Sequence, residues 1–366
     1  MPLIVLQNVH GENDAPLHIA LLEALERRGV LDAYDFVVDP TLDLTYCSML
    51  VDRFPQVQLH LPEGLMNRSV RRLSEITGRG VRFAAHFSAA SDAVCQSAGG
   101  GIHPDYSNSK SLFWRFPNAK RRAILFHSIE QGVIGQRDTA QSIASCDLII
   151  TRTVRSSEVA IAVGAAQRAV HVSSDIVFSR PESNPRTVPG LATALRVDKA
   201  IGNDAYLSEI VKILNYFEQL NIPIDQTPIE KPLGQEQLTR GYHKGDHPLI
   251  KLWNKQSIYE PFETRRQAVI SSRLHTTLLA LMAGNLKILQ FQIEPNTTKI
   301  TDILADIGLG SFPVLSKADV SVDTIKDFLE GPENLDQNEV SAALAKARAL
   351  NEAALDRMEE WLMTLR

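Results

Sequence analysis

Cysteine is scarce in this sequence, and the few that occur stand far apart. Cys47, Cys95 and Cys146 are the three cysteines in a chain of 366 residues. They form neither a CxxC pair nor the ligand spacing of a zinc motif, which excludes the common cysteine-based redox and zinc sites. We expect free thiols in a reducing compartment rather than disulfides, and therefore a cytoplasmic protein.

The sequence also lacks a long apolar run and an excess of positive charge. It has no stretch of about 18 apolar residues, so no membrane-spanning helix is expected. Residues 1–6 have no basic region followed by a long apolar run, and they predict a first β-strand rather than a secretory signal. The formal net charge of −5 argues against bulk nucleic-acid binding, so we expect no nucleic-acid partner.

The sequence instead alternates between strand and helix patterns. The chain is long enough for two domains. Hydrophobic residues make up 44% of the chain and charged residues 22%, as in ordinary globular proteins. In the first half, strands are expected at 3–9, 35–38, 57–61, 81–87, 123–127, 147–152 and 169–172, and helices at 15–28, 66–77, 139–145 and 156–163. This rhythm predicts a parallel sheet wrapped by helices.

A polar segment with several prolines at 179–190 interrupts the pattern, as an interdomain linker would. Beyond it, strands are expected at 191–197, 268–270, 286–291 and 312–315, and helices at 206–220, 262–267, 276–284, 300–307, 322–329 and 338–365. Residues 222–256 read as a loop-rich insertion. We therefore expect an N-terminal Rossmann-like domain over 1–180, a C-terminal one over 190–337, and a final helix over 338–366 that can pack across both.

The most informative segment is the turn Ser271-Ser272-Arg273-Leu274-His275, between an apolar strand and an apolar helix. It places Arg273 and His275 at the carboxyl end of a strand, where open α/β sheets bind ligands. An arginine fork suits a carboxylate or phosphate, and a histidine can move protons near neutral pH. Ser271 and Ser272 can cap the helix, whose first N–H groups attract anions. The alternative is a set of purely structural hydrogen bonds.

Four further segments follow predicted strands and could line a ligand site. Asp14 lies where a helix begins and could be a plain N-cap. Gly99, Gly100 and Gly101 let backbone N–H groups approach an anion, although a flexible loop is the alternative. His103 follows them directly. Arg152 ends another strand, and residues 128–135 read as an ordinary strand-to-helix loop.

Taken in order, these segments resemble the polysaccharide pyruvyltransferase family over about residues 80–310. The matching elements are the triple glycine, a strand ending in Arg152 before a serine-containing helix, and Asp175 before an apolar pair. The most specific match is the Ser-x-Arg-Leu-His turn, followed by a helix ending in Gly284, a strand and then Lys299.

The chain departs from the family's pattern at several positions. Thr153 stands where the family has aspartate after the first arginine, and Thr276 stands where it has glycine after the histidine. The usual Gly-x-Pro before the last strand is Gly284-Asn285-Leu286 here, and the N-terminal Gly-Asn-x-Gly-Asp pattern is reduced to residues 11–14.

The resemblance implies a GT-B-like fold of two Rossmann-like domains facing a cleft. Such enzymes transfer the pyruvyl group of phosphoenolpyruvate to two hydroxyls of a sugar, forming a cyclic ketal and releasing phosphate. His275 and Arg273 are then the candidate catalytic residues. Candidate donor-binding residues are Arg152, Lys299, Gly99, Gly100, Gly101 and Ser272, with Asp14 and His103 on the acceptor side. Phosphoenolpyruvate is the donor substrate, no cofactor or metal is required, and a glycan or lipid-linked oligosaccharide is the acceptor.

Other functions stay open at this point. A nucleotide-sugar glycosyltransferase of the same fold would bind UDP or GDP compounds instead, and a non-catalytic carbohydrate-binding relative is a third possibility. A lipid-linked acceptor would place the protein at the inner face of the membrane, where the basic helix at 66–77 could lie against an anionic surface. His243, Asp246 and His247 could hold a divalent ion, but their setting favours a solvated loop.

Overall fold

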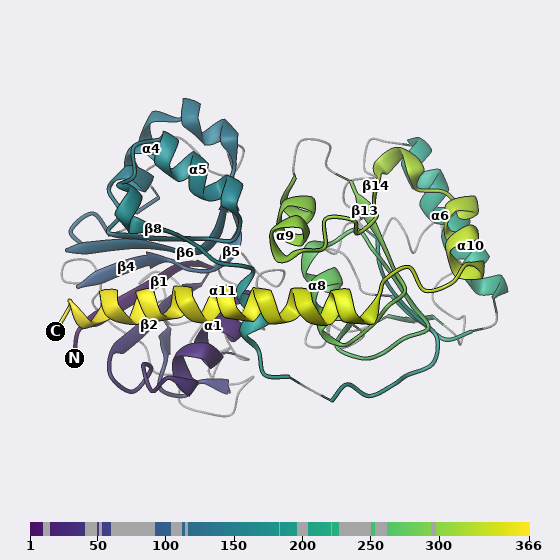
Figure 1. Cartoon of the computed structure of the whole chain (residues 1–366), viewed down its shortest axis with the longest axis horizontal. Coiled ribbons are helices and arrows are strands. Elements are labelled where there is room, and N and C mark those ends of the chain that lie inside the picture. The colour runs from purple at the N-terminus through teal and green to yellow at the C-terminus, as the bar shows by residue number, and fades with distance from the viewer. Residues whose placement is uncertain are drawn as a thin grey trace, which may run out of the picture. The chain divides into compact units, whose positions relative to one another are not determined.

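The computed structural model describes residues 1–9, 15–40, 50, 53–59, 92–103, 112–113, 116–182, 184–195, 204–220, 222–226, 250–252, 262–293 and 298–366. Figure 1 shows the whole chain. By its internal contacts the chain divides into two compact units, Met1–Arg180 with Lys346–Arg366, and Pro181–Ala345. Among the described residues, no helix is long and apolar enough to cross a membrane.

The first unit is built on a sheet in which every pairing is parallel. The order is β3-β2-β1-β4-β6-β7-β8, and β5 pairs with β6. The strands are β1 (Leu3–Val9), β2 (Asp35–Pro40), β3 (Gln58–Leu59), β4 (Ala93–Gln96), β5 (Gly99–Ile102), β6 (Arg121–Ile129), β7 (Leu148–Thr151) and β8 (Val170–Val172). The strand order reverses between β1 and β4, which makes their carboxyl ends a favoured position for a ligand.

Two apolar layers cover the two faces of this sheet. Helix α1 (Ala15–Arg27) and the C-terminal part of α11 (Gln337–Met363) pack on one face, where Leu21 and Met358 join Leu6 in the core. Helices α4 (Arg137–Ala144) and α5 (Val154–Ala162) pack on the other face, where Ile143 and Val159 meet Val5. Figure 1 shows this arrangement of helices on both faces, the architecture expected of a parallel sheet.

The second unit repeats the same plan. Its strands are β9 (Leu191–Ala194), β10 (Ile224–Gln226), β11 (Ile250–Leu252), β12 (Ala268–Ser271), β13 (Ile288–Gln292) and β14 (Val314–Ser316). They pair in parallel in the order β11-β10-β9-β12-β13-β14, so the order reverses between β9 and β12. The helices are α6 (Asp204–Gln219), α8 (Leu274–Met282), α9 (Lys299–Ile307) and α10 (Val322–Glu330).

Three sequence predictions about elements are corrected by this fold. Residues Gly99–Ile102 are a strand, not a loop, because their backbone pairs with β6. Residues 263–267 are not helical, because the Arg265 and Gln267 N–H groups donate to Arg186 and Gly190 of the linker. The segment 222–256 is not all loop, since it contributes β10 and β11. The predicted helix at 66–77 and strand at 81–87 lie outside the described residues.

Gly284 ends helix α8 in a left-handed conformation, with φ of +73°. Its N–H donates to the Leu281 carbonyl, and the Asn285 N–H donates to the Ala280 carbonyl, the paired bonds of a Schellman motif. A Cβ here would also lie 3.2 Å from the Arg265 guanidinium.

We therefore expect Gly284→Ala to lower the free energy of unfolding by about 1–2 kcal/mol, measured by urea denaturation. Gly310→Ala is the control, because Gly310 has no positive φ and its nearest atoms are 3.9 Å away. Equal losses in the two variants would contradict the assigned conformation.

Cys95 and Cys146 are both buried, unbridged thiols, and Cys47 lies outside the described residues. Burial raises the pKa of both thiols, which disfavours the reactive thiolate. In a Cys47→Ser variant, we expect Ellman's reagent to label neither thiol rapidly until the protein is unfolded. Fast labelling of the native variant would contradict this burial.

Candidate functional site

The turn between β12 and α8 is fixed from inside by hydroxyl groups. The buried Ser271 hydroxyl accepts a hydrogen bond from the Arg273 N–H at 2.9 Å and contacts the Thr276 hydroxyl at 2.5 Å. Ser272 donates from its hydroxyl (3.1 Å) and its N–H (2.9 Å) to the Ala194 carbonyl at the end of β9. These bonds tie the turn to the strand across the point where the strand order reverses.

Ser271 and Ser272 do not cap the helix as predicted. Arg273 is the N-cap residue of α8, in an extended conformation and with no side-chain capping bond. The two serine hydroxyls shape the turn instead. Ser272 was also predicted to bind the donor, and its hydroxyl is directed to Ala194 in this structure.

Arg273 and His275 lie at the carboxyl end of β12, and both are half-buried, so both side chains keep part of their surface exposed. His275 is in the first turn of α8, where backbone N–H groups are available to an anion. Lys299 begins α9, which follows β13, the strand next to β12 in the sheet. The carboxyl end of β12 therefore presents one guanidinium and one imidazole, while Lys299 begins the helix that follows the neighbouring strand.

Thr276, the residue after His275, is built into the turn by its side chain. Its side chain is fully buried, and its hydroxyl donates to the Arg273 carbonyl at 2.9 Å. It therefore supplies an internal bond that holds Arg273 in place. The neighbouring Thr277 hydroxyl donates to Gln290 of β13.

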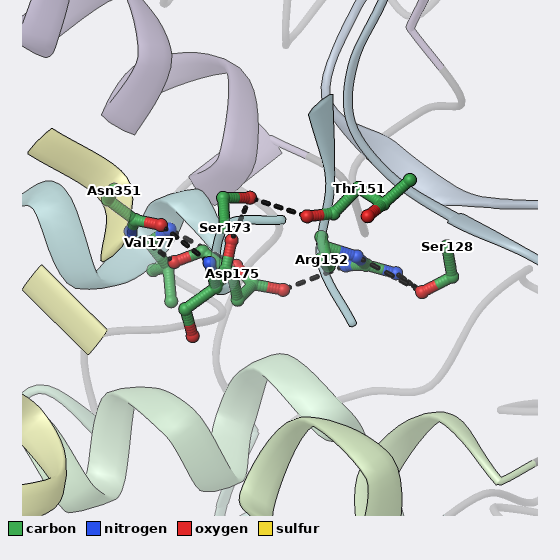
Figure 2. Close-up of polar contacts among 8 residues, drawn as sticks. Ser128, Thr151, Arg152, Ser173, Asp175, Val177 and Asn351 are labelled. Carbon is green, nitrogen blue, oxygen red and sulfur yellow. Dashed lines mark hydrogen bonds and ion pairs between the residues drawn. The ribbon is translucent and has the colours of Figure 1, made fainter. Parts of the chain in front are cut away.

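Arg152 sits inside the first unit in a closed polar network, as Figure 2 shows. Its side chain is 0% exposed and forms an ion pair of 2.8 Å with the equally buried Asp175. Its Nε and Nη2 atoms donate to the Ser128 hydroxyl at 3.2 and 2.9 Å. Two elements of the family resemblance, Arg152 and Asp175, thus bind each other. Binding of a donor by Arg152 stays a prediction, and it would require the donor to displace the Asp175 carboxylate.

Asn351 extends this network to the C-terminal helix, and the sequence analysis missed it. Its side chain accepts from the Ser174 N–H at 2.9 Å and donates to the Asp175 carbonyl at 2.8 Å. Its position gives the available signal, because Asn351 stands four residues after Ala347 and four before Leu355, both buried. An asparagine on the apolar stripe of a helix indicates a buried polar partner.

Thr153 is the N-cap of α5, and its hydroxyl accepts from the Ser156 N–H at 3.1 Å. Threonine is among the residues favoured at this position, so Thr153 has a structural role as a cap. Near it, β6 bulges at Phe126, which is buried with φ of +52°. Bulges redirect side chains, and the next residues, His127 and Ser128, supply polar groups to the interior.

The remaining predicted residues lie in β5, directly after it, or outside the described residues. Gly99, Gly100 and Gly101 belong to β5, where Gly99 pairs with His127 of β6. His103 follows β5 and is half-buried. Asp14, His243, Asp246 and His247 fall outside the described residues. Within those residues, no cluster of three or more histidine, cysteine or carboxylate side chains is placed to hold a metal ion.

Comparisons with known proteins relate this chain to others by fold. No protein-family model and no curated protein matches its sequence. Among solved structures, it is similar to Staphylococcus aureus MnaA bound to UDP, at 12% identity and a TM-score of 0.60, over 98% of this chain and 96% of that one. It is also similar to a UDP-N-acetylglucosamine 2-epimerase from Listeria monocytogenes, described as putative, at 12% identity and a TM-score of 0.58, over 99% and 97%.

A third similar structure is Anabaena HepE in complex with UDP, at 8% identity and a TM-score of 0.52, over 100% of both chains. Matches of this length across both units establish the fold and nothing finer. The protein has two Rossmann-like α/β domains of the GT-B type, each with a parallel sheet covered by helices.

Proposed function

We propose that this protein is a ketal pyruvyltransferase, which transfers the pyruvyl group of phosphoenolpyruvate to two hydroxyls of a glycan. The observation that carries the proposal is the Ser271–His275 turn, which presents Arg273 and His275 at the carboxyl end of β12, beside the reversal of strand order. The resemblance of this turn to the pyruvyltransferase family supports the reaction class.

The reaction explains why these side-chain types are needed. Phosphoenolpyruvate carries a carboxylate and a phosphate, so its site requires cations and backbone N–H donors. The C3 methylene gains a proton, one sugar oxygen bonds to C2, and a second sugar oxygen then displaces phosphate from C2. The two sugar hydroxyls lose one proton each. One proton is equivalent to that gained by C3, which becomes a methyl group, and the other leaves with the phosphate.

The residues of the β12 edge fit these steps. Arg273 binds one anionic group of the donor through its planar fork, and Lys299 contributes a second positive charge. His275 delivers or accepts the proton near neutral pH. The N–H groups that open α8 face the same edge and favour the phosphate. A polysaccharide precursor, including a lipid-linked one at the inner membrane face, is the proposed acceptor.

Ligand-induced thermal stabilisation tests the proposed donor. At about 100 times its dissociation constant, phosphoenolpyruvate should stabilise the protein by about 2.7 kcal/mol. We expect the shift with phosphoenolpyruvate, no shift with UDP- or GDP-sugars, and loss of the shift in Arg273→Ala. Lys212→Ala is the matched control, because Lys212 is an exposed cation on α6 of the same unit.

A second candidate function is sugar-nucleotide processing. It is favoured by the similar structures, two of which hold UDP and one of which is a putative UDP-N-acetylglucosamine 2-epimerase. The same experiment separates the two candidate functions. Thermal stabilisation by a UDP-sugar alone would assign the carboxyl end of β12 to a nucleoside diphosphate. In both cases the protein would be an enzyme that acts on sugars.

A further inference from the structure

The two central strands of the first sheet each carry a buried glutamine toward their carboxyl ends. Gln7 closes the apolar run of β1 and Gln96 closes that of β4, and the two residues are direct partners in the parallel register. Gln7 is 5% exposed and Gln96 is 1% exposed. Apolar side chains precede both residues in their strands.

Within the part of the chain that the structure describes, one amide atom of this pair has no partner. The Gln7 Nε2 donates to Gln96 Oε1 at 3.2 Å and also to the Leu112 carbonyl. The Gln7 Oε1 is enclosed and, among the described residues, accepts no hydrogen bond. A buried acceptor without a donor costs free energy that an apolar residue of the same size would not cost. A ligand hydroxyl is the donor that would satisfy it.

The position of the pair is that of a ligand site. β1 and β4 flank the reversal of strand order in the first sheet, and Gln7 and Gln96 lie toward their carboxyl ends. Ser97 and His18 form a second buried polar pair beside it, with the Ser97 hydroxyl 3.1 Å from His18 Nδ1. These four side chains include no carboxylate, lysine or arginine, in contrast to the cationic edge of β12.

We infer that the Gln7/Gln96 pair binds hydroxyl groups of a neutral sugar. An amide offers both a donor and an acceptor, which matches a hydroxyl group, while a neutral site gives no attraction to phosphate. The inference rests on the proposed function, in which this sugar is the acceptor and the anionic donor binds at the β12 edge.

Saturation-transfer NMR with the methyl glycosides of glucose, galactose and mannose tests this inference. We expect at least one glycoside to bind the wild-type protein. Each of Gln7→Met and Gln96→Met should weaken that binding about threefold to tenfold, and the double variant more strongly. Gln141→Met is the control, because Gln141 is exposed on α4, and it should leave binding unchanged.

The melting temperature of the same variants gives a second readout. If the amides serve a ligand and not the fold, the double methionine variant should melt at or above the wild-type temperature. Glycoside binding that is unchanged in the double variant, or absent from the wild-type protein, would overturn the inference. Thermal stabilisation by phosphoenolpyruvate, measured on the same samples, reports separately on the β12 edge and on the proposed function.

Discussion

Replacing Arg152 with alanine should lower the free energy of unfolding by about 3–5 kcal/mol, because it leaves the buried Asp175 carboxylate without its ion partner. Both side chains are 0% exposed, so the Asp175 carboxylate is shielded from bulk water. The damage should spread through the turn that Asp175 begins, where its Oδ1 accepts from the Val177 N–H at 3.1 Å. Chemical denaturation monitored by circular dichroism measures the loss.

Two comparisons distinguish this network from an ordinary ion pair. Arg121→Ala breaks the pair of Arg121 with Asp147, whose side chains are 36% and 34% exposed, and should cost at most about 1 kcal/mol. The double variant Arg152→Met/Asp175→Asn removes both charges, keeps a side-chain oxygen for the Val177 N–H, and should recover much of the stability lost in Arg152→Ala. A loss in Arg152→Ala no larger than that in Arg121→Ala would contradict the buried pairing.

Replacing Arg273 or His275 with alanine should affect two different steps of the proposed reaction. Arg273→Ala removes charged hydrogen bonds to the donor and should weaken phosphoenolpyruvate binding about 10-fold to 150-fold. His275→Ala should leave that affinity within about threefold and lower the rate of phosphate release in the presence of acceptor about 100-fold to 1,000-fold. Calorimetric titration measures the first effect and a phosphate-release assay the second.

This division of roles also has a matched control. Lys212→Ala changes an exposed cation on α6 and should alter neither quantity. Phosphoenolpyruvate affinity that is equal in wild type and Arg273→Ala would remove Arg273 from the donor site. A His275→Ala variant that loses affinity and rate in equal measure would indicate that His275 binds the donor rather than moving a proton.

Some elements with an apolar run and a clear boundary could be predicted closely from the sequence. The strand at 3–9 and the helix at 300–307 stand close to their predicted limits, because each has an apolar stripe flanked by turn residues. The prediction of a loop at Gly99–Gly101 was wrong, because glycine has no side chain that could show a strand pattern. Pairing with β6 makes this segment extended. The prediction of a helix at 263–267 was wrong, because the backbone N–H groups of this segment donate to a linker that is distant in sequence.

The position of Arg273 and His275 at the carboxyl end of β12 was predictable from the sequence. The contacts of the other candidate residues were predictable only in part. Arg273 and His275 follow a buried strand directly, so the parallel fold places them at its carboxyl end. The pairing of Arg152 with Asp175 joins residues 23 positions apart, and Asn351 joins the network from the other end of the chain. The Gln7/Gln96 pair likewise depends on the register of two strands separated by more than eighty residues. Such contacts follow from topology, which local patterns do not specify.

The most direct test of the account is a crystal structure of the protein soaked with phosphoenolpyruvate, with a UDP soak in parallel. We predict phosphoenolpyruvate at the carboxyl end of β12, with one anionic group on the Arg273 guanidinium and the C3 methylene facing His275. UDP bound at this edge, with phosphoenolpyruvate absent from it, would contradict pyruvyl transfer and assign the protein to sugar-nucleotide chemistry.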